Sequence, residues 1–470
     1  MLRTSMGMLA LLVGCNEVHA FATCTWTGGD GANFNWSNAS NWDNCGGIRL
    51  VPDDTDTLVF PDSAPTASKT NTNDLVNLKP ATIQLGGQAY NISGNAITLS
   101  TAILTNTGPG ISGPKFAPAI TLSSGATFDC QAGYFVFLTG ALNINTFGFA
   151  VDGPCNTSLK GPVSGSGGLF KYGTGTLYMQ TGANTYTGAT TIFGGTIYAG
   201  DDNVLGAAGL ANATTIKATA SLTLYLGVNL PESLNLDGGT LDNFLGDNRV
   251  TGNISLTSES FVSAAADTTL TLSGPLAGNA LKLNKIGAGT VVIEDASNIG
   301  YLAVGGGVLE LNGVADGGSI NPGTLAGKGP MTNTLVLNSG GRLSPGSARG
   351  KNPGTFSGIR LNWQNDGICE FQLGNRADLI ALSVGFSKVG SGIYSFEFHD
   401  GSTPPKVGVA YPLITFTTAP NFLASAFTFT YAGTGPGPEL VGTFALTASA
   451  LTFTPSMVDS DLIFRDGIEP

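Results

Sequence analysis

The chain has 470 residues and a formal net charge of −12 at pH 7, and 11% of its residues are Asp, Glu, Lys or Arg. Because an acidic chain repels phosphate groups, this charge argues against nucleic-acid binding through a basic face and against attraction to anionic lipid. The 42% hydrophobic residues argue against a disordered polar tract, and the 68 glycines can supply many turns.

Residues 1–22 have the features of a signal peptide. A basic residue near the start precedes the short apolar stretch 6–13, and Ala20-Phe21-Ala22 matches the small-x-small cleavage pattern. We therefore predict cleavage between Ala22 and Thr23 and export of the remaining chain. The apolar stretch is far shorter than the roughly 20 residues that span a bilayer, and no later segment is long and apolar enough. We thus expect no transmembrane segment in the mature chain.

A second interpretation of the same segment is a lipoprotein signal. Leu12-Val13-Gly14-Cys15 resembles a lipobox, in which Cys15 would be acylated and the chain tethered to the cell envelope. We favour simple cleavage because the Ala-x-Ala site lies so close downstream.

Five cysteines follow the predicted cleavage site. In an oxidising compartment near neighbours should form disulfides, which predicts the pairs Cys24–Cys45 and Cys130–Cys155. The second separation is close to one turn of a β-helix, in which stacked positions lie about 4.8 Å apart and within disulfide range. Cys369 is left over, and we expect a buried thiol. No cysteine pair has CxxC spacing, so we predict no metal site and no cofactor.

Three tryptophans lie inside the loop that the first predicted disulfide would close. Trp26, Trp36 and Trp42 belong to a module that we place at residues 23–62. Their ring faces could form a platform on which sugars stack. We favour a second interpretation, a cap, because the open end of a β-helix exposes strand edges that must be covered and Trp buries a large area.

Short runs of alternating apolar and polar residues dominate the rest of the chain. They are followed by Gly, Asn, Asp or Ser and begin about every ten to fifteen residues, which is typical of all-β folds. A sandwich or barrel rarely needs this length in one piece, whereas a solenoid can have any length. We therefore predict a parallel β-helix over residues 63–400, with on the order of 17 turns of roughly 22 residues each.

Internal repetition supports the solenoid. The segment Lys171-Tyr-Gly-Thr-Gly-Thr-Leu177 recurs as Lys285-Ile-Gly-Ala-Gly-Thr-Val291. A Gly-Gly-x-apolar step follows each copy about twenty residues later, and such periods are characteristic of stacked units. Paired glycines permit a sharp corner between strands. The steps lie at 194–197 and 306–309, and again at 238–241 and 340–343.

These motifs resemble a known family. Residues 167–177 and 182–197, the latter including Asn-Thr-Tyr-Thr-Gly, closely resemble the autotransporter-associated β-strand repeat, also called the passenger-associated transport repeat. We place repeat copies near 165–206 and 274–314, the second without Asn-Thr-Tyr-Thr-Gly. The resemblance implies a right-handed parallel β-helix displayed outside the cell.

The C-terminal part departs from that resemblance. A full autotransporter ends in a membrane barrel of several hundred residues, and we expect none here, so self-export is doubtful. We expect a β-rich end at residues 401–455 and an acidic tail at 456–470. The tail resembles the short acidic tails of some exported Gram-negative proteins, and a frayed terminus is its other interpretation.

The residues offer little for catalysis. After cleavage one histidine remains, and His399-Asp400-Gly401 is interpreted as a turn, so a Ser-His-Asp or Cys-His triad is not expected. The rival interpretation is a polysaccharide lyase or hydrolase, which needs clustered carboxylates. Capping of turns by Asp explains the available acidic residues more simply. The candidates for the rival are Asp201, Asp202, Asp237, Asp242, Asp247 and Arg249.

Together the patterns predict an exported structural or adhesion-type β-helix without catalytic, cofactor-binding or metal-binding residues. We expect it outside the cell or on its outer surface, with the periplasm as the alternative compartment. Cell-surface glycans, or the surfaces of host or neighbouring cells, are the expected partners, and nucleic acid is not. The oligomeric state is left open.

Overall fold

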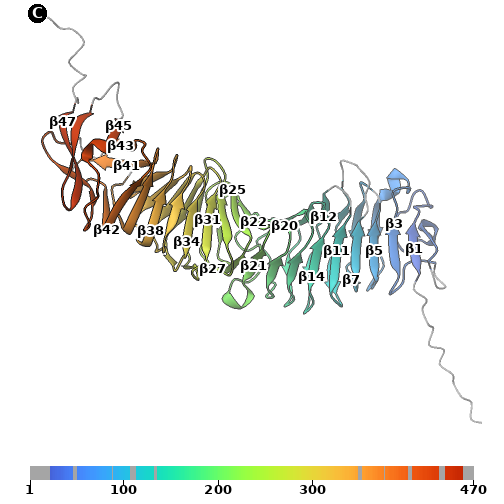
Figure 1. The fold of residues 1–470 in the computed structure, drawn as a ribbon. Coiled ribbons are helices and arrows are strands. Elements are labelled where there is room, and N and C mark those ends of the chain that lie inside the picture. The colour runs from blue at the N-terminus through green and yellow to red at the C-terminus, as the bar shows by residue number, and fades with distance from the viewer. Residues whose placement is uncertain are drawn as a thin grey trace, which may run out of the picture.

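A computed structural model describes residues 22–45, 50–86, 88–105, 113–131, 135–347, 352–374, 376–400, 405–432 and 440–458. It is an elongated all-β rod in which strands of successive turns stack side by side (Figure 1). The rod has about 15 turns, and within the described ranges it contains no α-helix. The predicted parallel β-helix is confirmed. The short 3-10 helices are η1 (Ala39–Asn41), η2 (Thr66–Lys69), η3 (Leu210–Asn212) and η5 (Ala424–Ala426).

Two long sheets form the sides of the rod. Sheet A contains, in spatial order, β2 (Trp42–Asp43), β1 (Thr23–Trp26), β3 (Thr57–Phe60), β5 (Thr82–Leu85), β8 (Ala102–Thr105), β11 (Ala126–Cys130), β14 (Phe149–Asp152), β17 (Leu169–Lys171), β19 (Thr190–Ile192), β21 (Thr214–Lys217), β24 (Leu234–Asp237), β27 (Ile254–Leu256), β30 (Leu276–Ala277) and β33 (Ala296–Ser297). Sheet B contains β4 (Thr70–Asn73), β6 (Asn91–Gly94), β9 (Lys115–Phe116), β12 (Val136–Leu138), β15 (Thr157–Leu159), β18 (Thr176–Met179), β20 (Gly195–Ala199), β22 (Ala220–Tyr225), β25 (Thr240–Leu245), β28 (Ser260–Ala264), β31 (Lys282–Ile286), β34 (Tyr301–Val304), β36 (Gly318–Ile320), β38 (Met331–Leu337), β40 (Thr355–Gln364), β42 (Leu379–Val389), β44 (Tyr411–Thr415), β47 (Ala450–Val458) and β46 (Leu440–Leu446).

The third side changes along the rod. Sheet C covers the N-terminal part, and sheet D covers the C-terminal part. Sheet C contains β7 (Ile97–Leu99), β10 (Ile120–Leu122), β13 (Leu142–Asn143) and β16 (Val163–Ser164). Sheet D contains β23 (Asn229–Leu230), β26 (Asn248–Val250), β29 (Thr269–Leu272), β32 (Thr290–Ile293), β35 (Val308–Leu311), β37 (Thr324–Gly327), β39 (Arg342–Pro345), β41 (Ile368–Leu373), β43 (Tyr394–Asp400) and β45 (Phe427–Tyr431).

Strand register aligns the apolar residues of successive turns. In sheet A, Ile83 pairs with Ile103 and Ile103 pairs with Phe128, so one turn takes 20 residues and the next takes 25. These lengths bracket the predicted period. Because alternate strand residues point inward, the paired apolar side chains form one continuous buried column.

The predicted N-terminal cap covers the first turn. Trp26, Trp36 and Trp42 are buried together, and each indole N–H has a hydrogen-bond acceptor. The disulfide between Cys24 and Cys45, with a Cα–Cα distance of 4.3 Å, closes this module. Buried indoles have no free face on which a sugar could stack, so these tryptophans act as a cap.

The remaining cysteines lie within the β-helix. Cys130, at the end of β11, is bonded to Cys155, with 5.7 Å between their Cα atoms. Cys369 lies on β41 as a buried thiol, and burial raises its pKa well above the usual value.

The C-terminal end is β-rich, as predicted, and closes with antiparallel strands. β47 pairs antiparallel with both β44 and β46, and phenylalanines pack beneath them. The predicted turn at His399 and Asp400 is wrong, because both residues lie on β43. The predicted signal peptide up to residue 21, including Cys15, and residues 459–470 of the predicted tail lie outside the described residues. No helix in the described part of the chain is long and apolar enough to cross a bilayer.

Candidate functional site

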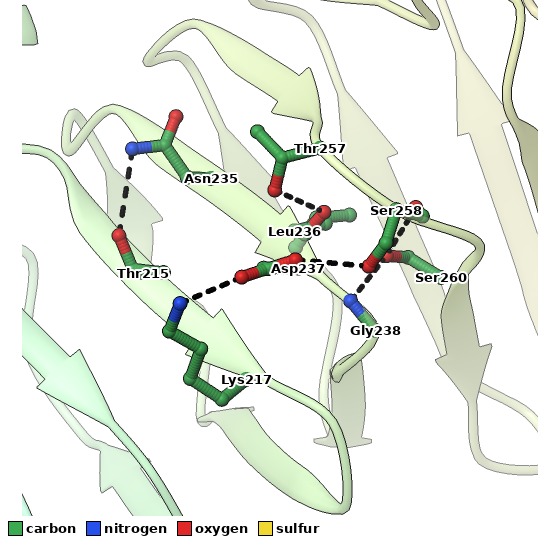
Figure 2. Close-up of polar contacts among 9 residues, drawn as sticks. All are labelled: Thr215, Lys217, Asn235, Leu236, Asp237, Gly238, Thr257, Ser258 and Ser260. Atoms are coloured by element: carbon green, nitrogen blue, oxygen red, sulfur yellow. Dashed lines mark hydrogen bonds and ion pairs between the residues drawn. The ribbon is translucent and has the colours of Figure 1, made fainter.

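Asp237, one of the carboxylates considered for catalysis, ties neighbouring turns together (Figure 2). Its Oδ2 lies 2.7 Å from Nζ of Lys217 on the preceding turn, and its Oδ1 accepts a 3.0 Å hydrogen bond from Oγ of Ser258 on the following turn. The hydrogen bond from Lys217 is the main reason that the pKa of Asp237 is lowered. The carboxylate is therefore engaged in holding three turns in register.

The structure does not gather the other candidates into one cluster. Asp242 lies on the outer face of sheet B, while the rest serve separate turns or ion pairs. In the described part of the chain no three His, Cys, Asp or Glu residues are placed to hold a metal ion. The separate contacts are Asp201 with the amide of Asp202 (2.7 Å), Asp202 with that of Asn229 (2.6 Å), Asp247 with that of Thr269 (2.9 Å), and Arg249 with Glu294 (2.8 Å).

The two repeat copies share a buried lysine that sequence reasoning missed. Lys171 and Lys285 each occupy an inward position between aliphatic neighbours, and they are 1% and 0% exposed. The Nζ of Lys285 donates 2.9 Å hydrogen bonds to the carbonyl oxygens of Ile286, Gly287 and Gly306.

Lys171 makes the equivalent contacts at its own corner. Its Nζ donates to the carbonyls of Tyr172, Gly173 (3.1 Å) and Gly194 (3.4 Å). Each ammonium group therefore joins the Gly-x-Gly corner of its own turn to the paired glycines of the next turn. Burial lowers the pKa of both lysines to about 8. The lysine that opens both repeat copies was the signal in the sequence.

A row of outward-facing aromatic rings follows sheet B across neighbouring turns. Tyr178 on β18 pairs in register with Tyr198 on β20, and their rings stack with centroids 5.1 Å apart. Tyr198 also makes edge contacts with Tyr225 and Phe244, at centroid distances of 6.4 and 5.9 Å. At the other end Phe135 packs on Tyr178 at 5.0 Å. We call these five residues the aromatic row.

A β-bulge lies at Phe244, whose side chain faces outward as strand alternation requires. Leu224 pairs with Asn243, whereas Tyr225 pairs with Leu245, so Phe244 is an extra residue in β25 and is 50% exposed. The bulge is fixed from the inside by the buried side chain of Asn243. Its Nδ2 donates to the carbonyl of Gly246 at 3.0 Å and to Oγ1 of Thr268 at 2.8 Å, while its Oδ1 accepts from Nδ2 of Asn248.

The aromatic row encloses part of a surface pocket of about 290 Å³. Burial is the main reason that the pKa of Tyr198 is raised, and the carboxylate of Asp242 adds to it. The neutral hydroxyl of Tyr198 can donate a hydrogen bond. The pocket therefore combines ring surfaces with polar groups, as ligand sites usually do. Its lining is Tyr178, Gln180, Tyr198, Gly200, Tyr225 and Phe244.

In the sequence, Tyr178 and Tyr198 each lie between two apolar residues of a strand. Alternation along the strand therefore indicates that both tyrosine side chains face outward. What the sequence did not show is that these positions align across turns of unequal length. Sequence reasoning therefore placed no site here.

Comparison with known proteins gives one partial similarity. No family model matches the chain. Over 236 residues, which are 50% of this chain, the sequence is 29% identical to the Adhesin BmaC autotransporter of Brucella suis biovar 1 (strain 1330). The chain is similar to part of an autotransporter adhesin. The match covers 6% of that adhesin's length, so the chain corresponds to a small part of it. The assignment to a specific repeat family stays a prediction.

Proposed function

We propose that the chain is an exported adhesion-type protein, displayed on the outer cell surface or released, whose β-helix presents its sides to other surfaces. The observation that carries the proposal is the similarity to an autotransporter adhesin, together with a rod of stacked turns. A long rod holds a lateral binding face away from the surface that anchors it. No catalysis is part of the proposal, because every candidate carboxylate except Asp242 is used in a turn or an ion pair.

Attachment of coated beads tests the adhesive role. Beads carrying residues 23–470 should attach to cultured epithelial cells in larger numbers than beads carrying an unrelated acidic protein. Equal attachment of the two kinds of bead would contradict adhesion.

A depolymerisation assay on acidic polysaccharides provides a separate check, since cleavage that disappears in Asp242→Ala would establish the enzymatic alternative.

Mass spectrometry of the mature N-terminus in the source cell tests export. A free Thr23 is the expected result, because β1 begins at that residue and Ala22 precedes the first strand. An acylated Cys15 would identify an envelope-tethered lipoprotein, and an intact Met1 in the cytoplasm would contradict export.

A further inference from the structure

We propose that the pocket beside Tyr198 binds one pyranose ring of a neutral oligosaccharide. The inference rests on the proposed adhesive function and assigns its ligand class and contact site. It starts from the chemistry of the lining, in which three phenol rings and one phenyl ring lie beside the carboxamide of Gln180. A pyranose ring matches such a surface, because its C–H face is apolar and its rim carries hydroxyl groups.

The size of the pocket limits what it can hold. A volume of about 290 Å³ lies just below the roughly 300–1,000 Å³ that is usual for small-molecule sites. One sugar ring, with its neighbours extending along the open face of sheet B, fits this volume better than a helix or a folded protein segment. The stacked rings of Tyr178 and Tyr198 cover each other's faces, so the ring of Phe244 is the wall that remains free for stacking.

The charges around the pocket select against acidic ligands. Asp242 is close enough to contribute to the raised pKa of Tyr198, and Asp201 and Asp202 follow directly on the pocket residue Gly200. The ammonium group of Lys160, just after β15, lies over the ring of Phe137, and neither residue lines the pocket. Carboxylates at this distance repel a sialic or uronic acid, so a neutral sugar is the ligand that the charges admit.

Buried hydrogen bonds hold the backbone beside Phe244 in place before any ligand binds. Phe244 sits at a bulge that a buried asparagine network holds in place, and bulges are common next to functional sites. A backbone segment that is already ordered loses little conformational entropy on binding, which favours affinity. The buried network therefore favours the interpretation of the bulge as part of a binding site over its interpretation as a surface irregularity.

The test uses the chain 23–470 on a printed array of neutral and sialylated oligosaccharides, followed by calorimetric titration with the best neutral glycan. We expect retention of neutral glycans and weaker retention of their sialylated counterparts. Phe244→Ala should weaken binding by about ten-fold or more, as expected for an anchoring aromatic side chain. Tyr301→Ala is the matched control, since Tyr301 is also exposed and outward-facing on sheet B but lies outside the pocket.

A second variant fills the pocket without altering the backbone. A Cβ atom at Gly200 would meet its nearest neighbours, on Met179 and Gln180, at an ordinary 3.6 Å, and Gly200 has no positive φ. Gly200→Leu should therefore fold normally and abolish binding. Binding of sugar that is unchanged in both pocket variants, or an array on which no neutral glycan is retained, overturns the proposal.

The bead assay separates this proposal from the proposed function. If beads attach but Phe244→Ala and Gly200→Leu beads attach equally well, the glycan pocket is wrong while the adhesive role stands. If the pocket variants lose attachment but enzymatic deglycosylation of the cells has no effect, the partner is a protein and the glycan assignment is wrong. If glycans bind at the pocket but beads do not attach to cells, the pocket stands and the adhesive role fails.

Discussion

At the scale of single residues, buried charge is the least expected feature of this β-helix. Lys171 lies in an inward column between Val151 and Ile192, where an aliphatic residue would avoid the cost of removing charge from water. The cost is offset by hydrogen bonds from the ammonium group to three carbonyl oxygens at a glycine corner. Lys285 makes the same contacts at its own glycine corner, so a buried lysine is a shared feature of the two corners.

Replacing Lys171 by a side chain of similar length tests whether its hydrogen bonds stabilise the glycine corner. Lys171→Met keeps the packing but removes the donor, and it should destabilise the affected turns by about 1–3 kcal/mol because buried carbonyls lose their partner. Urea unfolding followed by circular dichroism measures the change. Lys217→Met is the control, since the Lys217 side chain is 41% exposed and its ion pair should contribute less than about 1 kcal/mol. A larger loss in the control would refute the assignment.

Glu232 should make stability depend on pH. Burial raises its pKa to about 8, and Thr214 donates to one of its oxygens at 3.3 Å. Between the unfolded value near 4.5 and about 8 the folded state holds a proton that the unfolded state has lost, so this contribution to stability falls as pH rises through that window. Glu232→Gln removes the dependence, and it should be more stable than the parent at pH 8 but not at pH 4. Equal melting temperatures of the two proteins at pH 8 would contradict this prediction.

At the scale of secondary-structure elements, a side chain substitutes for a strand where the third side changes. Sheet C ends at β16 and sheet D begins at β23, and the turns between them have no third strand, although all of their residues are described. Asn184 bridges this gap. Its Oδ1 accepts from the amide of Val163 at 2.8 Å, and its Nδ2 donates to the carbonyl of Val204 at 2.8 Å. This explains the Asn in the Asn-Thr-Tyr-Thr-Gly motif.

Removing this bridge should loosen the third side. Asn184→Ala leaves buried backbone groups on both adjacent turns without partners, and the expected loss is about 1–3 kcal/mol. Asn235→Ala is a matched control, because Asn235 is only half-buried and makes a single long hydrogen bond of 3.5 Å to Thr215. Thermal unfolding of both variants shows whether Asn184→Ala lowers the melting temperature more than Asn235→Ala does. Equal effects would show that Asn184 is no more important than an ordinary surface asparagine.

The same strands and turns show which features of the fold and of the pocket could be predicted from the sequence. Alternation and glycine corners predicted the coiling because they are local patterns, and the Gly-Gly step about twenty residues after Lys171 and after Lys285 indicated its period. The pocket could not be predicted, because sheet B turns of 19 to 25 residues decide which outward positions align, and the bulge at Phe244 depends on distant buried partners. His399 was misassigned because the dipeptide Asp400-Gly401 has the composition of a turn, while pairing with β41 keeps His399 and Asp400 in a strand.

At the scale of the whole molecule, each turn contacts mainly the turns before and after it. Stability in such a rod is approximately a sum of local terms and nearest-neighbour terms, so damage should stay local. The two ends are closed differently, by the indole cap at the N-terminus and by antiparallel strands with phenylalanines at the C-terminus. Each end can therefore be weakened separately.

Hydrogen exchange measured by mass spectrometry can follow this locality. Replacing Cys24 and Cys45 by Ala opens the loop that closes the cap, and loss of such a cross-link typically costs about 2–4 kcal/mol. We expect faster exchange in β1, β3 and β5 and unchanged exchange in β41 and β43, more than 280 residues away along the chain. Cys369→Ala, which leaves a small cavity in the core beneath β41, should produce the opposite pattern. Faster exchange along the entire rod in either variant would mean that the turns unfold as one cooperative unit, and the nearest-neighbour description of this β-helix would have to be abandoned.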